Sequence, residues 1–213
     1  MVKCDKTFKI SLIGDSKVGK TSFVNKLRTG EFEKTTYCTM GLEVRPLYIK
    51  VFKSDEVQPI FVQLNIWDCA GDEKYRGMGD AYWIKSDAAI VMYDISKYED
   101  VMYRKSQIIT NVQHWIRDYC RINKANDGIC VVGNKADICN KHVSKTIITH
   151  LGSDMEINNT KYNPFRHSLR SCPVNISTKT GENITKPILC ILRYLLNDDN
   201  LTITICNTKT QKH

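Results

Sequence analysis

The chain has 213 residues, of which 42% are hydrophobic, and carries a formal net charge of +8 at neutral pH. This length suits one domain with an ample core. No signal peptide or membrane-spanning run is visible, so neither secretion nor membrane insertion is expected. The basic residues are scattered and no aromatic-basic reading motif occurs, so we expect attraction to acidic protein partners and no direct nucleic-acid binding.

The first predicted elements are an apolar strand at residues 8–13 and an amphipathic helix at residues 21–28, joined by a glycine-bounded turn. The turn is a complete G-x-x-x-x-G-K-T motif, whose backbone N–H groups and helix N-terminus bind phosphate. Lys20 is expected to reach the β- and γ-phosphates, and the Thr21 hydroxyl to coordinate magnesium. The predicted nucleotide contacts of this phosphate loop are Asp15, Ser16, Lys17, Val18, Gly19, Lys20, Thr21 and Ser22.

Residues 42–53 and 59–67 predict an antiparallel hairpin. Asp68 closes its second strand, and an acid at a strand end beside a phosphate loop orders magnesium. Gly71 follows in the sequence Asp68-Cys69-Ala70-Gly71, where the missing side chain lets its backbone N–H approach a γ-phosphate.

Two later motifs point to guanine. Asn134-Lys135-Ala136-Asp137 follows a buried strand at residues 129–133. The Asp137 carboxylate can accept two N–H bonds from guanine at once, a donor pair that adenine lacks, while Asn134 and the Lys135 stem hold the loop and cover the base. Ser177-Thr178-Lys179 follows residues 173–176 and can offer a backbone N–H to the guanine oxygen. Together with the phosphate loop, this set predicts that the chain binds GTP and GDP with Mg²⁺.

The remaining pattern predicts an α/β fold of the P-loop NTPase class: a six-stranded, mostly parallel sheet with one antiparallel edge strand and about five flanking helices. One helix carries the apolar stripe Ile108, Val112, Trp115, Ile116 and Tyr119; another carries Ile184, Ile188, Leu189, Leu192 and Leu195, with Pro187 in its first turn. We expect a single domain at residues 1–203 with a long loop at 138–172 and a short basic tail at 204–213. The nine cysteines contain no C-x-x-C pair, which favours free thiols in a reducing compartment.

The motif set resembles the Ras superfamily, and the residues between the motifs resemble its Ran family. The similar stretches are residues 29–34, 39–47, 67–77, 186–187 and 197–201. The resemblance implies that Phe32 packs edge-on against guanine. It also implies that Thr39 meets both Mg²⁺ and the γ-phosphate, so that the loops around Thr39 and Gly71 order in the GTP state. Lys20, Thr39, Gly71 and residue 72 would then form the catalytic set, and Thr21, Thr39 and Asp68 the metal set.

The same resemblance implies importin- and exportin-type receptors, an exchange factor and an activating protein as partners, a monomeric state, and a location in nucleus and cytoplasm. Rab-type GTPases are the next nearest family, which Gly14-Asp15-Ser16 favours. Rab proteins normally end in prenylated cysteines, and the sequence has no such ending, so we expect no lipid anchor.

Three departures from the Ran pattern matter for function. Asp72 stands where the family has the glutamine that orients the attacking water, so slow GTP hydrolysis is expected. Lys17 replaces a phosphate-loop glycine, with its side chain either in solvent or turned toward the phosphates. The stretch 138–172 is longer than its Ran counterpart and is either a partner-binding insertion or a tolerated loop.

Two functions therefore stay open: a cycling transport switch with weak hydrolysis, and a hydrolysis-deficient mimic that binds transport receptors in the GTP state. A Rab-like vesicle GTPase is the third alternative.

Overall fold

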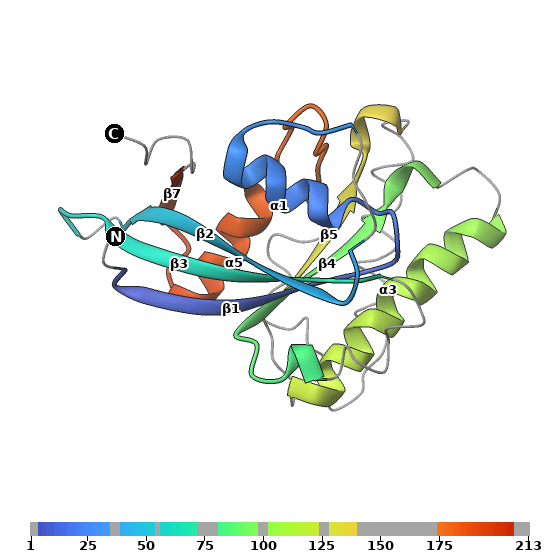
Figure 1. Ribbon diagram of the computed structural model, residues 1–213, viewed down its shortest axis with the longest axis horizontal. Helices are drawn as coiled ribbons and strands as arrows, with labels where there is room; N and C mark the ends of the chain where they lie inside the picture. Colours follow the sequence, from blue (N-terminus) through green and yellow to red (C-terminus); the bar gives the residue numbers. More distant parts are fainter. Residues whose placement is uncertain are drawn as a thin grey trace.

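The computed structural model describes residues 4–34, 39–53, 56–71, 81–97, 102–123, 128–139 and 174–206, with the backbone alone at 102–106. Within these residues a mixed β-sheet forms the centre of the molecule, and helices cover it on both faces (Figure 1). The predicted α/β class is confirmed.

The sheet has seven strands in the described residues, in the order β6-β5-β4-β1-β3-β2-β7. Their bounds are β1 Lys6–Ile13, β2 Leu42–Phe52, β3 Ile60–Cys69, β4 Ala88–Asp94, β5 Ile129–Asn134, β6 Val174–Asn175 and β7 Thr202–Cys206. The predicted hairpin is β2–β3, and β2 runs antiparallel to both of its neighbours. All other neighbouring pairs are parallel.

The structure thus adds one strand to the six expected. β7 pairs with the outer edge of β2, so the antiparallel strand lies second from the edge rather than at it. The missed signal is the alternation of Thr202, Ile203, Thr204 and Ile205, since Ile203 and Ile205 pack against the core while Thr202 and Thr204 are exposed. β7 also runs to Cys206, past the expected domain boundary at 203.

Three longer helices flank the sheet: α1 Lys20–Thr29, α3 Met102–Asn123 and α5 Lys186–Leu196. Short 3-10 turns, η2 Ile95–Lys97 and η3 Ala136–Ile138, follow β4 and β5, and residues 81–83 are also helical. Pro187 lies at the start of α5, where its missing N–H costs no helical bond. No helix among the described residues is both long and apolar enough to cross a lipid bilayer.

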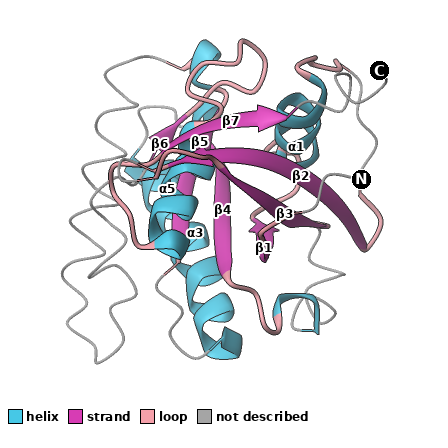
Figure 2. Cartoon of the chain, turned by 90° about the vertical axis from the view of Figure 1, so that its left-hand side faces the viewer, coloured by secondary structure: helices cyan, strands magenta, loops and turns pink. Residues whose placement is uncertain are grey.

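The core has two parts, one on each face of the sheet. Figure 2 shows the helices α1 and α3 on different sides of the strands. On one face α1 and α5 pack Phe23, Val24 and Ile188 against strand residues such as Ile10. On the other face α3 packs its predicted stripe, including Val112, Trp115 and Tyr119, against alternate residues of β4 and β5. Strands buried on both faces are typical of parallel α/β sheets.

This topology brings the motifs to one end of the sheet. β1 lies between β3 and β4, so the chain direction of the connections reverses beside it, and ligands bind outside the carboxyl ends of strands at such a point. Leu12 pairs with Asp68, and Asp94 pairs with Asn134, which places the ends of β3, β4 and β5 next to the phosphate loop. The loop at 138–172 lies outside the described residues, apart from its first two.

Candidate nucleotide and magnesium site

The phosphate loop leaves β1 through a tight turn at Gly14. A Cβ on Gly14 would lie 2.1 Å from the carbonyl oxygen of Met92, so only glycine fits there. Gly19 then begins α1 in the left-handed conformation, and no side chain caps the helix. The first turn of α1 contains no acidic residue. Its backbone N–H groups are therefore free for an anion such as a phosphate.

Lys20 is buried at the centre of this loop, with 6% of its surface exposed. Its Nζ donates hydrogen bonds to the carbonyl oxygens of Gly14, at 2.7 Å, and Asp15, at 2.8 Å. Burial lowers the pKa of Lys20 to about 8, although the nearby carboxylates of Asp68 and Asp15 oppose that shift. A bound polyphosphate would supply the negative charge that such a desolvated ammonium group lacks.

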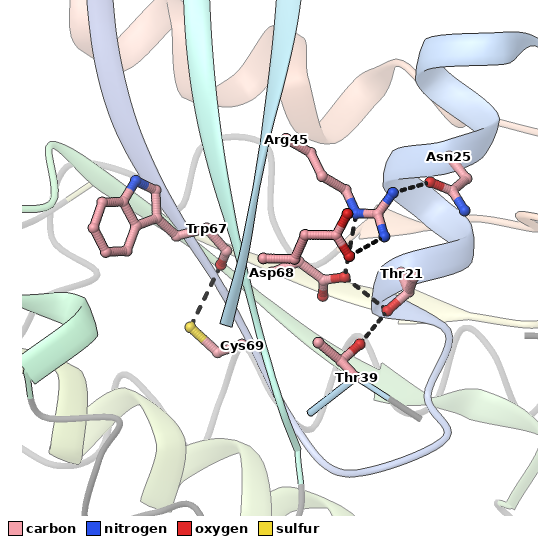
Figure 3. Close-up of polar contacts among 8 residues, drawn as sticks. Thr21, Asn25, Thr39, Arg45, Trp67, Asp68 and Cys69 are labelled. Carbon is pink, nitrogen blue, oxygen red and sulfur yellow. Dashed lines mark hydrogen bonds and ion pairs between the residues drawn. The ribbon is translucent and has the colours of Figure 1, made fainter. Parts of the chain in front are cut away.

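Three elements meet at the predicted metal site (Figure 3). Thr21 from α1 donates a hydrogen bond to Asp68 Oδ2 at 2.7 Å. Thr39, which precedes β2, lies 2.8 Å from the Thr21 hydroxyl oxygen and donates to it, because the Thr21 proton is already engaged. Thr21 thus forms one polar cluster with Thr39 and Asp68, which are 18 and 47 positions away from it in the sequence.

This cluster fits a Mg²⁺ ion. Asp68 is fully buried, and its Oδ1 has no hydrogen-bond partner among the described residues. Burial raises its pKa, while the Thr21 hydrogen bond and the Lys20 charge act against that rise. A cation beside Oδ1 would satisfy this oxygen. Mg²⁺ is usually held by one or two carboxylates plus phosphate oxygens, and Asp68 would supply one such carboxylate beside the phosphate loop.

Gly71 lies directly against the phosphate loop. A Cβ at this position would lie 2.4 Å from Lys20 Nζ and 2.5 Å from the carbonyl carbon of Asp15. The close approach to Asp15 therefore requires glycine, and the predicted approach of its N–H to a γ-phosphate stays a prediction. Asp72, the next residue, lies outside the described residues, and its catalytic role stays a prediction.

The guanine motifs meet on the far side of the loop. Asn134 is buried, its Nδ2 donates to the Val18 carbonyl at 2.9 Å, and its Oδ1 accepts from the Thr178 N–H at 3.0 Å. Asp137 accepts a 2.7 Å hydrogen bond from the Ser177 hydroxyl. The structure thus joins the two base-binding motifs to each other and to the phosphate loop.

A comparison with known families decides the superfamily. The model of the Roc family, described as the Ras-of-complex domain of DAPkinase, matches residues 9–137. The chain belongs to the Roc family. Roc is a GTPase domain of the Ras superfamily, so the predicted superfamily and its guanine-nucleotide-binding function are confirmed at that level.

The Roc match contains the phosphate loop, the metal cluster, Gly71 and Asn134 to Asp137. Ser177, Thr178 and Lys179 come after the matched residues, and the structure alone places them at the site; Lys179 Nζ lies 3.9 Å from Asp137 Oδ2. Phe32 is half-buried in the segment after α1. Ser16 and Ser22 are half-buried in the loop and in α1, and the Lys17 side chain is exposed, as in the first of its two expected arrangements.

Two supporting groups of this Roc domain were not predicted from the sequence. Arg45 of β2 donates to Asn25 Oδ1 at 2.7 Å and to Glu43, and its Nε lies 3.8 Å from Asp68 Oδ2 (Figure 3). It joins β2 and α1 to the metal carboxylate. The sequence pattern that could have predicted this contact is the spacing of Glu43 and Arg45. They are two positions apart in a strand, so their side chains lie on the same face.

The second missed group is Asp94, at the carboxyl end of β4. It accepts a 2.7 Å hydrogen bond from Lys135 Nζ and caps the following turn through the Ser96 N–H at 3.0 Å. The ion pair holds the Lys135 side chain against the end of β4, next to the turn in which the Lys135 backbone adopts a positive φ of 69°. Asp94 could have been predicted by the same pattern as Asp68, because both are acidic residues at the end of a buried strand.

Proposed function

We propose that this Roc-family domain is a GTP/GDP switch of the Ran type. In this proposal it acts with importin- and exportin-type receptors, an exchange factor and an activating protein, in nucleus and cytoplasm. Two contacts support the switch. Thr39 is hydrogen-bonded to Thr21, which in turn donates to Asp68, and Gly71 lies against the phosphate loop. Loss of a γ-phosphate would release both segments, which lead into β2 and out of β3. The partner class rests on the Ran-like residues 39–47 and 67–77.

Asp72 favours a second candidate function, a GTP-locked binding module. An ionised aspartate only accepts hydrogen bonds, whereas the family glutamine also donates one to the developing charge. Two like charges about 4 Å apart repel by roughly 4 kcal/mol at an effective dielectric constant of ~20, so Asp72 opposes charge build-up on the phosphate. We therefore propose slow intrinsic hydrolysis.

Single-turnover hydrolysis of bound GTP with Mg²⁺ tests this proposal. The wild type should stay near the background rate, and Asp72→Gln should raise the rate many-fold. Asp72→Asn is the matched variant, since it removes the charge at unchanged length and so separates charge from reach. No change in Asp72→Gln would mean that another group orients the water, and a steep acceleration of the wild type by a Ran-type activating protein would exclude the locked module.

Receptor binding tests the partner class. An importin-type receptor should bind the domain loaded with a non-hydrolysable GTP analogue more tightly than the GDP-loaded domain, by at least tenfold. Equal binding of the two forms, or none, would contradict the Ran-type assignment while leaving nucleotide binding intact.

Base selectivity is a separate prediction. Because Asp137 can pair with two adjacent N–H groups of guanine, GDP should raise the unfolding temperature whereas ADP at the same concentration should not. A saturating ligand at about 100 times its Kd adds roughly 2.7 kcal/mol to the stability, which is readily measured by thermal shift. Equal stabilisation by ADP would contradict the guanine assignment.

A further inference from the structure

The side chain of Asp15, the second residue of the phosphate loop, points away from the phosphate site toward α3. Its Oδ1 accepts a 2.8 Å hydrogen bond from the indole N–H of Trp115, and its Oδ2 accepts a 3.0 Å hydrogen bond from Asn111 Nδ2. Asn111 and Trp115 are four residues apart on α3, so both donors lie on the same face of the helix. One helix therefore binds both oxygens of this carboxylate.

The main chain of the same residue is part of the nucleotide site. Its carbonyl accepts the hydrogen bond from Lys20 Nζ, and the backbone of Gly71 lies against it so closely that a Cβ there would be 2.6 Å from the Asp15 oxygen. Any displacement of Asp15 would consequently move an anchor of Lys20 and the surface on which Gly71 lies.

Trp115 is itself held in place. Its ring is 4% exposed and packs edge-on against Trp83, with the ring centroids 6.1 Å apart and the planes at 70°. Trp83 is also buried and ends the helical stretch at 81–83. Packing against Trp83 thus restricts the orientation of the Trp115 ring, and with it the direction of the indole N–H.

The charge of Asp15 explains why such a restraint matters. A carboxylate that is free to rotate within the loop would compete with the phosphates for the N–H groups at the start of α1 and would repel the nucleotide. The two donors on α3 are neutral, so they fix the position of the carboxylate without cancelling its charge.

We propose that Asn111 and Trp115 are positioning residues for nucleotide binding, which act on the phosphate loop through Asp15. This inference rests on the guanine-nucleotide binding of the Roc family and is independent of the partner class and of the hydrolysis rate. It gives α3 a direct mechanical connection to Lys20 and Gly71.

The rate of release of a fluorescent GDP analogue tests the inference. Trp115→Phe keeps an aromatic ring against Trp83 but lacks the N–H donor, and Asn111→Leu removes the other donor at similar volume. Each should speed release about tenfold, because a hydrogen bond to a charged group is lost. The control is Tyr119→Phe, which removes a hydroxyl from the same face of α3 one turn further on; that hydroxyl bonds the Ser86 carbonyl at 3.5 Å, so release should not change.

Double variants show whether the two donors act through Asp15. In an Asp15→Ala background, Trp115→Phe should not speed release further, since the carboxylate that Trp115 restrains is gone. An equal acceleration in both backgrounds, or unchanged release in both single variants, would overturn the proposal. If Trp115→Phe fails to fold, the half-buried Asn111→Leu carries the same comparison. Failure of the wild type to bind the analogue would instead overturn nucleotide binding itself.

Discussion

At the residue scale, Lys17 has a backbone conformation that is unfavourable for a residue with a side chain. It adopts a positive φ of 64° in the phosphate loop, a conformation that costs a residue with a Cβ about 1–2 kcal/mol. The exposed side chain makes no compensating contact that the structure shows. The phosphate loop therefore folds with local strain at this residue.

Replacing Lys17 by glycine should relieve that strain. Lys17→Gly is expected to raise the free energy of unfolding of the nucleotide-free protein by about 0.5–1 kcal/mol, since glycine adopts positive φ at no steric cost but loses more chain entropy. Urea unfolding measures the change. Ser16→Gly is the matched control, because Ser16 is not among the residues with positive φ and should lose stability. Equal effects at both positions would show that the backbone of Lys17 is not strained.

Cys69, between Asp68 and Gly71, is expected to be chemically inert in the folded protein. It is 5% exposed, and burial raises the pKa of its thiol to about 11, so that at pH 8 the thiol stays in its unreactive protonated form. Iodoacetamide labelling followed by peptide mass spectrometry should leave Cys69 unmodified at pH 8 and label it in urea. The partly exposed Cys206 serves as the comparison. Rapid labelling of Cys69 without denaturant would contradict its burial.

At the element scale, β7 covers only part of the outer edge of β2. The pairing joins Thr202–Cys206 to residues 48–52 of β2 and stops short of Pro46. Pro46 lies two residues beyond the end of this pairing, and proline has no N–H to donate to a strand ladder. Residues 42–47 of β2 thus pair with β3 on one side, and among the described residues no strand pairs with their outer edge.

The two isoleucines of β7 should contribute to stability although the strand is short. Ile203→Ala should lower the free energy of unfolding by about 1–2 kcal/mol, less than a fully buried isoleucine, because its side chain is half-buried against the core. Thr204→Ala, on the exposed face of the same strand, should change it by less than about 0.5 kcal/mol. Equal losses in urea unfolding would mean that β7 contributes through its backbone alone.

At the scale of the whole molecule, the metal site exists only because α1, the segment before β2 and the end of β3 meet. Chelation of Mg²⁺ should therefore speed nucleotide release, since the ion would link the phosphates to these three segments. Thr21→Val removes the hydroxyl that bonds both Thr39 and Asp68, and should release nucleotide rapidly with or without chelator. Insensitivity of the wild type to chelation, measured by the same fluorescent-GDP assay, would contradict a magnesium site here.

The sequence by itself determined the chemistry of the site, because its motifs are local. Residues 14–21 contain the glycines, lysine and threonine of a phosphate loop. Asp68 at the end of β3 and Asp137 just after β5 are the acids expected at strand ends. The apolar periodicity likewise predicted α3, α5 and the β2–β3 hairpin, since burial of one face fixes the spacing of apolar side chains.

Only the tertiary structure decided which distant residues support that chemistry. Arg45 beside Asp68, Asp94 beside Lys135 and Trp115 beside Asp15 join elements that are 23 to 100 positions apart, and no local pattern specifies such contacts. The place of β7 at the edge of the sheet belongs to the same class, because strand pairing depends on which edge is left open once the rest of the sheet has formed. Local sequence thus fixes the reacting groups, and long-range packing fixes the groups that hold them.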